Sequence, residues 1–219
     1  MKLTTTLVSL LLSLSTGIAT AQQEAARPAP TSLGPSKGAA QSDARGFIHR
    51  WRVLEPVPVA GRLTETAVQE ALKLAALPDG VNAADGVTVR VNDAEHKWHA
   101  LDTRNYNLNL YHFAWSLSKP TSNVLFWVET TVDSARELQN VRLAIGSNAA
   151  SHWWLNGELV IALNDDRQSV IDDGVSRRVT LRKGRNVIRA AIINGGGATD
   201  FCARFLDEND QPISGLQTP

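Results

Sequence analysis

The stretch SHWWLNGELV, residues 151–160, places two adjacent tryptophans directly before an Asn-Gly pair. Adjacent residues of a strand point to opposite faces of a sheet, so one of Trp153 and Trp154 faces a core and the other faces outward. Asn156-Gly157 is a preferred pair for a type I′ turn, in which both residues adopt positive φ. The stretch therefore predicts a β-hairpin in an antiparallel sheet.

Strand-like segments surround this hairpin. Alternating, β-branched or aromatic-rich runs are typical of strands, and a second hairpin is expected around Lys183-Gly184. Residues 187–193 are apolar on nearly both faces, which indicates a central strand. Helices do not alternate with the strands, as a parallel α/β fold requires. The pattern predicts an all-β fold, an antiparallel β-sandwich with one short accessory α-helix near the N-terminus. The other expected strands lie at residues 87–91, 123–132, 140–146 and 200–207.

The accessory helix is expected in TETAVQEALKLAALPDG, residues 64–80. Thr66 as the N-cap, with Gln69 three residues later, fits a capping box, and the Pro-Asp-Gly sequence ends the helix. Before it, residues 46–59 read as an edge strand that runs into an extended segment, because two prolines follow the apolar residues.

The N-terminal region has the composition of a processed leader and a linker. Residues 1–21 combine a positive Lys2, a short apolar run and a small-residue cleavage pattern, which predicts a signal peptide cleaved near Ala21/Gln22. Residues 22–44 are rich in Ala, Pro, Gly, Ser and Gln, which predicts a flexible linker. The β-sandwich domain is expected at residues 45–216. We expect a secreted or periplasmic protein without a membrane-spanning segment in the mature chain, because no later apolar run reaches about 18 residues.

Charge and cysteine content exclude several classes of function. The chain has 22 Lys and Arg residues against 22 Asp and Glu residues, and no basic cluster. This balance gives no electrostatic support to nucleic-acid or anionic-membrane binding. The single cysteine, Cys202, lies between apolar neighbours and is expected to be a buried thiol.

Several motifs together resemble galactose-binding-domain-like jelly rolls. VRLAIGSNAASHWWLNGELV, residues 141–160, is similar to their central hairpin. The stretch from residue 166 to residue 213 is similar to the remaining strands, and WRVLEPVPV, residues 51–59, is similar to the entry segment of many such exported domains. The resemblance covers roughly residues 51–212. It departs from the usual pattern where Asn148 replaces an acidic turn residue, and in the EPVP sequence.

The resemblance implies a jelly-roll sandwich of the kind appended to secreted glycoside hydrolases and acetylxylan esterases. Many such modules bind sugars, and others only join or brace domains. Modules of this kind also often carry a structural calcium. Carboxylate oxygens suit this hard cation, and four acidic loop residues are the candidate ligands. The alternative role of these residues is in turns, or in salt bridges of Asp166 or Asp172 with Arg167 or Arg204. These four residues are Asp165, Asp166, Asp172 and Asp173.

Aromatic residues provide the candidate sugar site. An aromatic face can stack on the apolar face of a pyranose and bury a large area, whereas a tryptophan in a β-sandwich more commonly belongs to the core. If Phe126 and Val128 face inward, Trp127 faces the helix or solvent, and Trp154 similarly opposes Trp153. The candidate sugar-binding residues are Trp127, Trp154, Tyr106, Tyr111, Asn148 and Arg167.

Three functions remain open from the sequence. The first is an exported, non-catalytic module that binds a polysaccharide or associates with a carbohydrate-active enzyme. The second is a structural or protein-interaction module without a small ligand. A carbohydrate-active hydrolase or esterase is the least favoured, because the chain lacks the Gly-x-Ser-x-Gly elbow and neighbouring carboxylates rarely supply both groups needed across a sugar.

Overall fold

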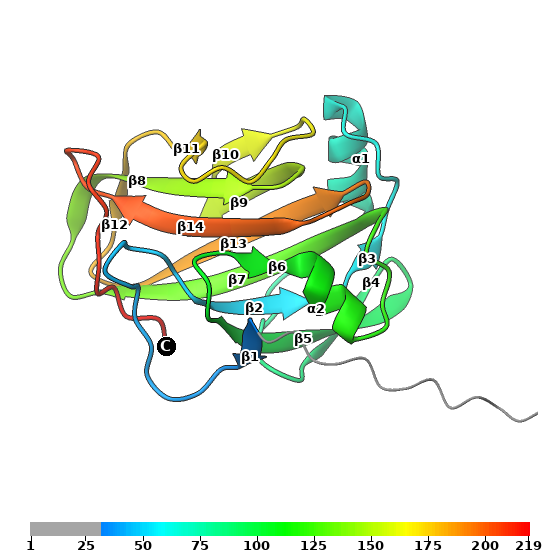
Figure 1. Cartoon of the computed structure of the whole chain (residues 1–219), viewed down its shortest axis with the longest axis horizontal. Coiled ribbons are helices and arrows are strands. Elements are labelled where there is room, and N and C mark those ends of the chain that lie inside the picture. The colour runs from blue at the N-terminus through cyan, green and yellow to red at the C-terminus, as the bar shows by residue number, and fades with distance from the viewer. Residues whose placement is uncertain (1–31) are drawn as a thin grey trace, which may run out of the picture.

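The computed structural model describes residues 32–219 and shows two antiparallel sheets packed face to face (Figure 1). The expected all-β antiparallel sandwich is confirmed. The predicted signal peptide, residues 1–21, and residues 22–31 of the predicted linker lie outside the described residues.

The larger sheet has nine strands, in the order β1-β5-β2-β7-β13-β9-β10, with β3 paired to β7 and β4 paired to β5. Its long central strands β7 and β13 pair over their full length, from Gly184 opposite Ser134 to Asn194 opposite Val124. β13 is central, as its apolar sequence predicts. The strands are β1 (Leu33–Pro35), β2 (Arg50–Leu54), β3 (Val57–Pro58), β4 (Thr88–Val91), β5 (Ala94–Thr103), β7 (Val124–Ser134), β9 (Ala150–Leu155), β10 (Glu158–Leu163) and β13 (Gly184–Asn194).

The smaller sheet has five strands, in the order β11-β8-β14-β6, with β12 paired to β8. Alternate residues of its two longest strands join the core between the sheets, so that one face meets the larger sheet. These residues are Val141, Leu143, Ile145, Phe201, Ala203 and Phe205. The strands are β6 (Leu108–Asn109), β8 (Leu138–Ser147), β11 (Gly174–Val175), β12 (Val179–Leu181) and β14 (Asp200–Leu206).

Three aromatic rings fill the middle of the core between the sheets. Trp51 lies 4.8 Å from Phe201 and 6.2 Å from Trp153, centroid to centroid, with both pairs edge to face. Both indole N–H groups are satisfied, since Trp51 donates to the carbonyl of Ile48 and Trp153 donates to the hydroxyl of Ser151. Trp153 is therefore the inward member of the tryptophan doublet, and this cluster fixes the register of β9.

A second apolar cluster lies on the outer face of the larger sheet, beneath α1 (Glu65–Leu74). Val68 and Ala71 of α1 are buried in this cluster with Trp127 of the sheet. The N-cap is Thr64, whose side chain accepts from the amide of Ala67, and not Thr66 as the sequence suggested. Only Thr66 is followed three residues later by Gln, but a threonine hydroxyl can cap without that partner, and the apolar face of the helix meets the sheet when the first turn starts at Glu65.

A second helix, α2 (Leu110–Ser116), was not expected. The sequence reads there as a loop leading into a strand, because aromatic and amide residues dominate it. Asn109 caps this helix by accepting from the amide of His112 at 2.7 Å. Leu110, Phe113 and Ala114 recur at helical spacing and join the core between the sheets. The short accessory helix expected from sequence is therefore one of two.

The first expected hairpin is confirmed and the second is wrong. β9 and β10 pair around Asn156 (φ 52°) and Gly157 (φ 87°), as a type I′ turn requires. β12 and β13 do not pair with each other, because β12 joins β8 in the smaller sheet and β13 lies in the larger one. The Asn186 side chain replaces strand pairing here, accepting from the Arg182 amide at 3.0 Å and donating to the Arg182 carbonyl at 2.8 Å.

The fold begins before the boundary expected at residue 45. Within the described part of the predicted linker, β1 pairs with β5, and the amide of Ser42 donates to the carbonyl of Leu216 at 2.8 Å. Backbone pairing holds this segment although it has few large apolar side chains. β2 is not the edge strand that its prolines suggested, because β5 and β7 flank it on either side. The described segment before residue 45 adds β1 beyond β5.

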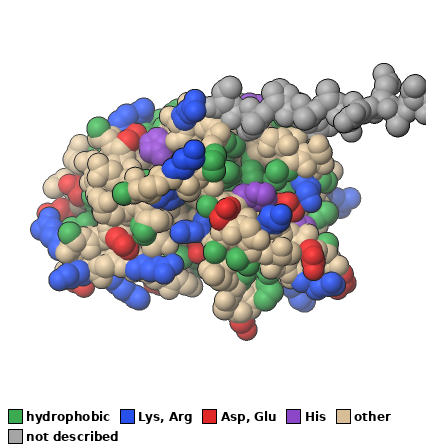
Figure 2. All heavy atoms as spheres, turned by 90° about the horizontal axis from the view of Figure 1, so that it is seen from below, with side chains coloured by type: hydrophobic (Ala, Val, Ile, Leu, Met, Phe, Trp, Pro, Cys, Tyr) green, Lys and Arg blue, Asp and Glu red, His purple; other side chains and the backbone are tan. Residues whose placement is uncertain are grey.

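The surface carries charges of both signs. On the face shown in Figure 2, Lys and Arg side chains are interspersed with Asp and Glu side chains. Within residues 32–219, no helix combines the length and apolar character needed to cross a membrane.

Candidate functional site

A groove of about 660 Å³ lies on the outer face of the larger sheet beside α1, and we call it the tryptophan groove. Trp127 of β7 and Trp154 of β9 line its floor, while Leu72, Ala76 and Leu77 line the side formed by α1 and the residues after it. Two of the sequence-predicted sugar contacts therefore lie in one groove.

Register brings the two tryptophans together across β13. Trp127 is paired with Ala191, and Ala191 is paired in turn with His152 of β9, two residues before Trp154. The alanine side chain is small, and the two indole rings meet with centroids 5.7 Å apart and planes inclined at 38°. The close approach of the two rings thus depends on a small residue in the central strand.

Trp127 is fixed in place by its indole nitrogen. Its N–H donates to the carbonyl of Ala75, the C-cap of α1, at 2.7 Å, and only 7% of the residue is exposed. This bond satisfies a carbonyl that a helix end leaves without an intrahelical partner. Trp127 therefore joins the helix to the sheet, and its own position in the groove is fixed.

Trp154 is the outward member of the doublet and is only half-buried. Its ring lies next to those of Trp127 and His152, with ring centroids 5.7 and 6.0 Å away. His152 is itself held by Asn164 at 2.8 Å. A half-exposed indole supported by two buried rings is a rigid surface on which a flat apolar ligand face can stack.

Polar groups surround the tryptophans. Asn156 and Gly157 of the β9–β10 turn line one part of the groove, with Arg182 and Arg189 nearby. Arg189, directly opposite Trp154 in the sheet, donates to Glu129 through Nε at 2.8 Å. Asn156 is held by Asn186 and by the amide of Val187, so its position is fixed. The groove thus combines stacking surface with hydrogen-bond donors.

Tyr106 and Tyr111 do not line the tryptophan groove. Tyr106 packs against Phe47 at 5.4 Å, with the Arg45 guanidinium over both rings. Tyr111 lies on α2 and contacts only the His112 ring among the aromatic contacts of the described residues. The expected site is therefore divided between separate places on the fold.

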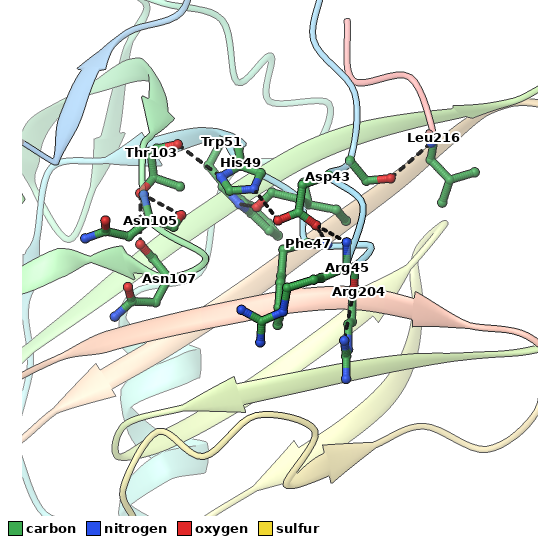
Figure 3. A network of polar contacts seen from close by, with 12 residues as sticks. Asp43, Arg45, Phe47, His49, Trp51, Thr103, Asn105, Asn107, Arg204 and Leu216 are labelled. Atoms are coloured by element: carbon green, nitrogen blue, oxygen red, sulfur yellow. Dashed lines mark hydrogen bonds and ion pairs between the residues drawn. The ribbon is translucent and has the colours of Figure 1, made fainter. Parts of the chain in front are cut away.

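The polar network beside Phe47 joins distant segments (Figure 3). Asp43 accepts from the amides of Arg45 and Phe47 and contacts Nε2 of His49 at 3.2 Å. Nδ1 of His49 contacts the carbonyl of Thr103 at 3.1 Å. Because both ring nitrogens are engaged with protein acceptors, this histidine braces the network and is poorly placed to take a proton from a substrate.

Asn148 and Arg167 lie together, at the end of β8 beyond the tryptophan groove. The amide of Asn148 donates to the carbonyl of Asp200, and the amide of Ala149 donates to the carbonyl of Arg167 at 3.0 Å. The side chain of Arg167 forms ion pairs with Asp165, at 3.6 Å, and with Asp173. These two candidate residues thus belong to a loop contact and not to the groove.

The acidic candidates for calcium are engaged with arginines. Arg204 donates to both carboxylate oxygens of Asp172, at 2.9 Å from Nε to Oδ1, and Arg167 pairs with Asp165 and Asp173. Within the described part of the chain, no three His, Cys, Asp or Glu side chains group as a metal site would require. Of the salt bridges named as the alternative, the pair of Asp172 with Arg204 is present, whereas Arg167 pairs with Asp165 and Asp173 and not with Asp166. Calcium binding by the four acidic residues stays a prediction.

Cys202 is buried on β14, as its apolar neighbours predict. Burial raises the pKa of its thiol to about 11, and the nearby carboxylates of Asp172 and Asp200 add to the shift. The thiol is therefore protonated at neutral pH, and the thiolate is the nucleophilic form. Cys202 serves as a small apolar side chain.

Sequence reasoning missed Arg182, Arg189 and Asn156 as groove residues. Alternation along β13 predicts that Arg189 faces the same side as Val187, and the type I′ turn places Asn156 at a strand end. Arg182 carries no such signal, because its position depends on the crossing from one sheet to the other.

No family model matches the chain, and no curated protein matches it. Solved structures that match this chain include a β-glucosidase from Kluyveromyces marxianus in complex with glucose, with TM-score 0.40 and 15% identity over 73% of this chain. The PA14 domain of the MpAFP antifreeze protein gives TM-score 0.41 and 10% identity over 84% of this chain and 95% of that domain. A GH31 α-xylosidase from Xanthomonas citri gives TM-score 0.30 and 13% identity over 85% of this chain.

This chain spans only part of the two enzymes, 17% of the β-glucosidase and 18% of the α-xylosidase. An anti-sigma factor domain-containing protein also matches, with TM-score 0.35 and 10% identity over 81% of this chain and 81% of that chain. TM-scores of 0.41 and below are too low to assign a function to this chain.

Proposed function

We propose that the protein is an exported, non-catalytic module of the galactose-binding-like jelly-roll type, and that it binds carbohydrate in the tryptophan groove. One observation carries this proposal: the half-exposed ring of Trp154 lies beside the fixed ring of Trp127 in a groove that also holds arginine and amide groups. Stacking on an aromatic face together with a few fixed polar groups is the usual means of holding a sugar ring.

Rigidity of the groove supports this function. Trp127 is locked to α1 by its bond to Ala75, and Asn156 is locked by Asn186. Groups already held in place lose little conformational entropy when a ligand binds. The groove is thus preorganised for ligand binding.

The charges in the groove favour binding over hydrolysis. Its charged lining residues are Arg182 and Arg189, and the carboxylate of Glu129 is taken up by Arg189. Acid–base glycoside hydrolysis uses a pair of carboxylates placed on either side of the scissile bond. Guanidinium groups instead orient a ligand through hydrogen bonds.

Affinity electrophoresis through gels containing single polysaccharides tests the proposal. We expect the protein to be retarded by at least one polymer, and Trp154→Ala to weaken that binding by about tenfold or more, because the stacking surface is removed. Tyr111→Ala is the matched control, since it removes an aromatic side chain from α2, away from the groove. This variant should migrate as the wild type does.

Two outcomes would overturn the proposal. Lack of retardation on every polymer in a broad panel would favour the alternative, a structural or interaction module. Retardation that Trp154→Ala leaves unchanged would place sugar binding elsewhere on the surface. Circular dichroism and thermal melting of each variant would establish that it is folded.

A further inference from the structure

A second groove, of about 470 Å³, lies on the other side of the β9–β10 turn. We call it the arginine groove, because Arg177, Arg178 and Arg182 line it. Asn156 and Arg182 line both this groove and the tryptophan groove. The two hollows therefore meet at these two residues and form one path across the end of the hairpin.

Arginine is the commonest charged residue that lines the combined path, in a chain whose net charge is zero. Four arginines line it, against the two glutamates Glu137 and Glu158. Guanidinium groups recognise carboxylate and sulfate-type oxygens through charge-assisted, often bidentate hydrogen bonds. An arginine on this path that is not already paired within the protein thus fits a ligand with negative charge.

Three of these arginines already have partners. Arg189 pairs with Glu129, Arg177 pairs with Glu158, and Arg178 pairs with Asp210 at 2.9 Å. Arg178 also donates to the carbonyls of Asn140 and Asp207, at 2.9 and 2.8 Å. These three side chains are therefore largely satisfied within the protein.

Arg182 differs, because its guanidinium has no hydrogen-bond or ion-pair partner among residues 32–219, although its backbone is fixed. Asn186, which is fully buried, donates to the Arg182 carbonyl and accepts from its amide. An exposed guanidinium on a fixed backbone, at the junction of an aromatic groove and a basic groove, is available to an outside anion.

We propose that the ligand is an anionic glycan, at least two sugar units long. One unit stacks on Trp154, and the carboxylate or sulfate of that unit or of the next pairs with Arg182, so that the chain continues into the arginine groove. This inference rests on the proposed sugar-binding function and names the class of ligand. Uronic acid and sulfated sugars supply the same chemistry, an oxyanion on a pyranose ring.

Binding of three kinds of polymer tests this class. We expect stronger binding to a polyuronate (polygalacturonate) or a sulfated glycan (chondroitin sulfate) than to a neutral one (xylan), and the first two polymers distinguish the two sources of negative charge. Arg182→Gln should weaken binding to the preferred anionic polymer by about tenfold, as expected for loss of a charge-assisted hydrogen bond. Its binding to neutral polymers should stay unchanged.

Lys183→Gln is the matched control, since it removes the same charge from the next residue, which lines neither groove. Equal losses in the two variants would show general ionic attraction and would overturn the assignment to Arg182. Such attraction would also disappear at high salt, where exposed charges are screened.

The outcomes separate this inference from the function on which it rests. If neutral glycans bind as tightly as anionic ones and Trp154→Ala abolishes both, sugar binding stands and the anionic preference is overturned. If no polymer of any charge binds, the sugar-binding function is overturned and this inference with it. If Arg182→Gln weakens binding to anionic polymers but Trp154→Ala does not, Arg182 is supported and stacking on Trp154 is wrong.

Discussion

At the scale of single residues, two neighbouring tryptophans on one sheet face serve different purposes. Trp127 has its N–H bound to the carbonyl of Ala75 and is almost completely covered. Trp154 lies beside it with part of its ring in solvent, and none of the described residues accepts its N–H. Trp127 therefore stabilises the contact between α1 and the sheet, while Trp154 is left free to meet a ligand.

This difference predicts unequal costs for the same substitution. Trp127→Phe leaves the buried carbonyl of Ala75 without its donor and leaves space beside the helix, so we expect a loss of about 2 kcal/mol in the free energy of unfolding. Trp154→Phe removes no hydrogen bond and should cost less than about 1 kcal/mol. Urea unfolding followed by circular dichroism measures both values. Equal losses would contradict the bracing role of Trp127.

At the scale of elements, hairpins and strands follow from local sequence and sheet crossings do not. The Asn156-Gly157 turn is predictable because only certain residue pairs tolerate two positive φ angles. The sequence that connects β12 to β13 resembles a hairpin just as closely. The crossing between sheets is visible only in the structure, where the two strands pair with different partners and the side chain of Asn186 bonds to the backbone of Arg182. α2 is missed because its single capping residue, Asn109, is a weak signal among amides.

The same limit applies to the candidate site. Strand alternation predicts that Trp153 and Trp154 face opposite sides of the sheet, without saying which faces outward, and that Trp127 faces outward if Phe126 and Val128 face inward. In the structure Phe126, Val128 and Trp153 lie in the core between the sheets, and Trp127 and Trp154 lie on the outer face. Their meeting depends on the register of both strands with β13 and on the small side chain of Ala191 between them. Arg182 lines the same groove because it lies where the chain crosses from β12 in the smaller sheet to β13 in the larger one. Such relations between distant segments are set by tertiary packing and leave no periodic signal in the sequence.

The crossing at Asn186 makes a prediction at this scale. Its fully buried side chain makes hydrogen bonds with the backbone of Arg182 and Gly184 and with the side chain of Asn156. Asn186→Ala leaves several of these groups unsatisfied, so we expect a loss of about 2–4 kcal/mol in the free energy of unfolding.

Thermal and urea unfolding measure this loss. Asn209→Ala, in an exposed turn, is the control and should change the free energy of unfolding by less than about 0.5 kcal/mol. A similar small effect at Asn186 would show that the backbone alone holds the crossing.

At the scale of the whole molecule, the two ends of the described chain are held together beside β2 and β5. Arg50, only 6% exposed, donates to the carbonyls of Lys37, Gly38 and Thr218. It also forms a two-pronged ion pair with Asp102 of β5, at 2.8 and 2.9 Å. One guanidinium thus ties an N-terminal segment and a C-terminal segment to the larger sheet, which closes this side of the sandwich.

Ion pairs on this side also make stability depend on pH. Burial by itself raises the pKa of Asp102, but hydrogen bonds from Arg50, from the amide of Lys37 and from the hydroxyl of Ser36 hold that pKa below its usual value. Glu55 behaves in the same way, since Lys119 and His99 outweigh its burial and lower its pKa. Each carboxylate is therefore more acidic in the folded chain than in the unfolded chain, where its pKa is about 4.

Acid should therefore unfold the protein through these carboxylates. A carboxylate with a lowered pKa in the folded state contributes stability above its unfolded pKa, and this contribution is lost as the pH falls through the folded value. The free energy of unfolding should thus decrease below about pH 4.

Asp102→Asn should be less stable at pH 7, because Arg50 loses its charged partner, and its stability should fall less steeply between about pH 4 and pH 2. The control is Asp79→Asn, in the exposed turn after α1, whose free energy of unfolding should vary with pH as that of the wild type does. If the stability of Asp102→Asn falls as steeply with decreasing pH as that of the wild type, the Arg50–Asp102 pair does not determine the loss of stability in acid.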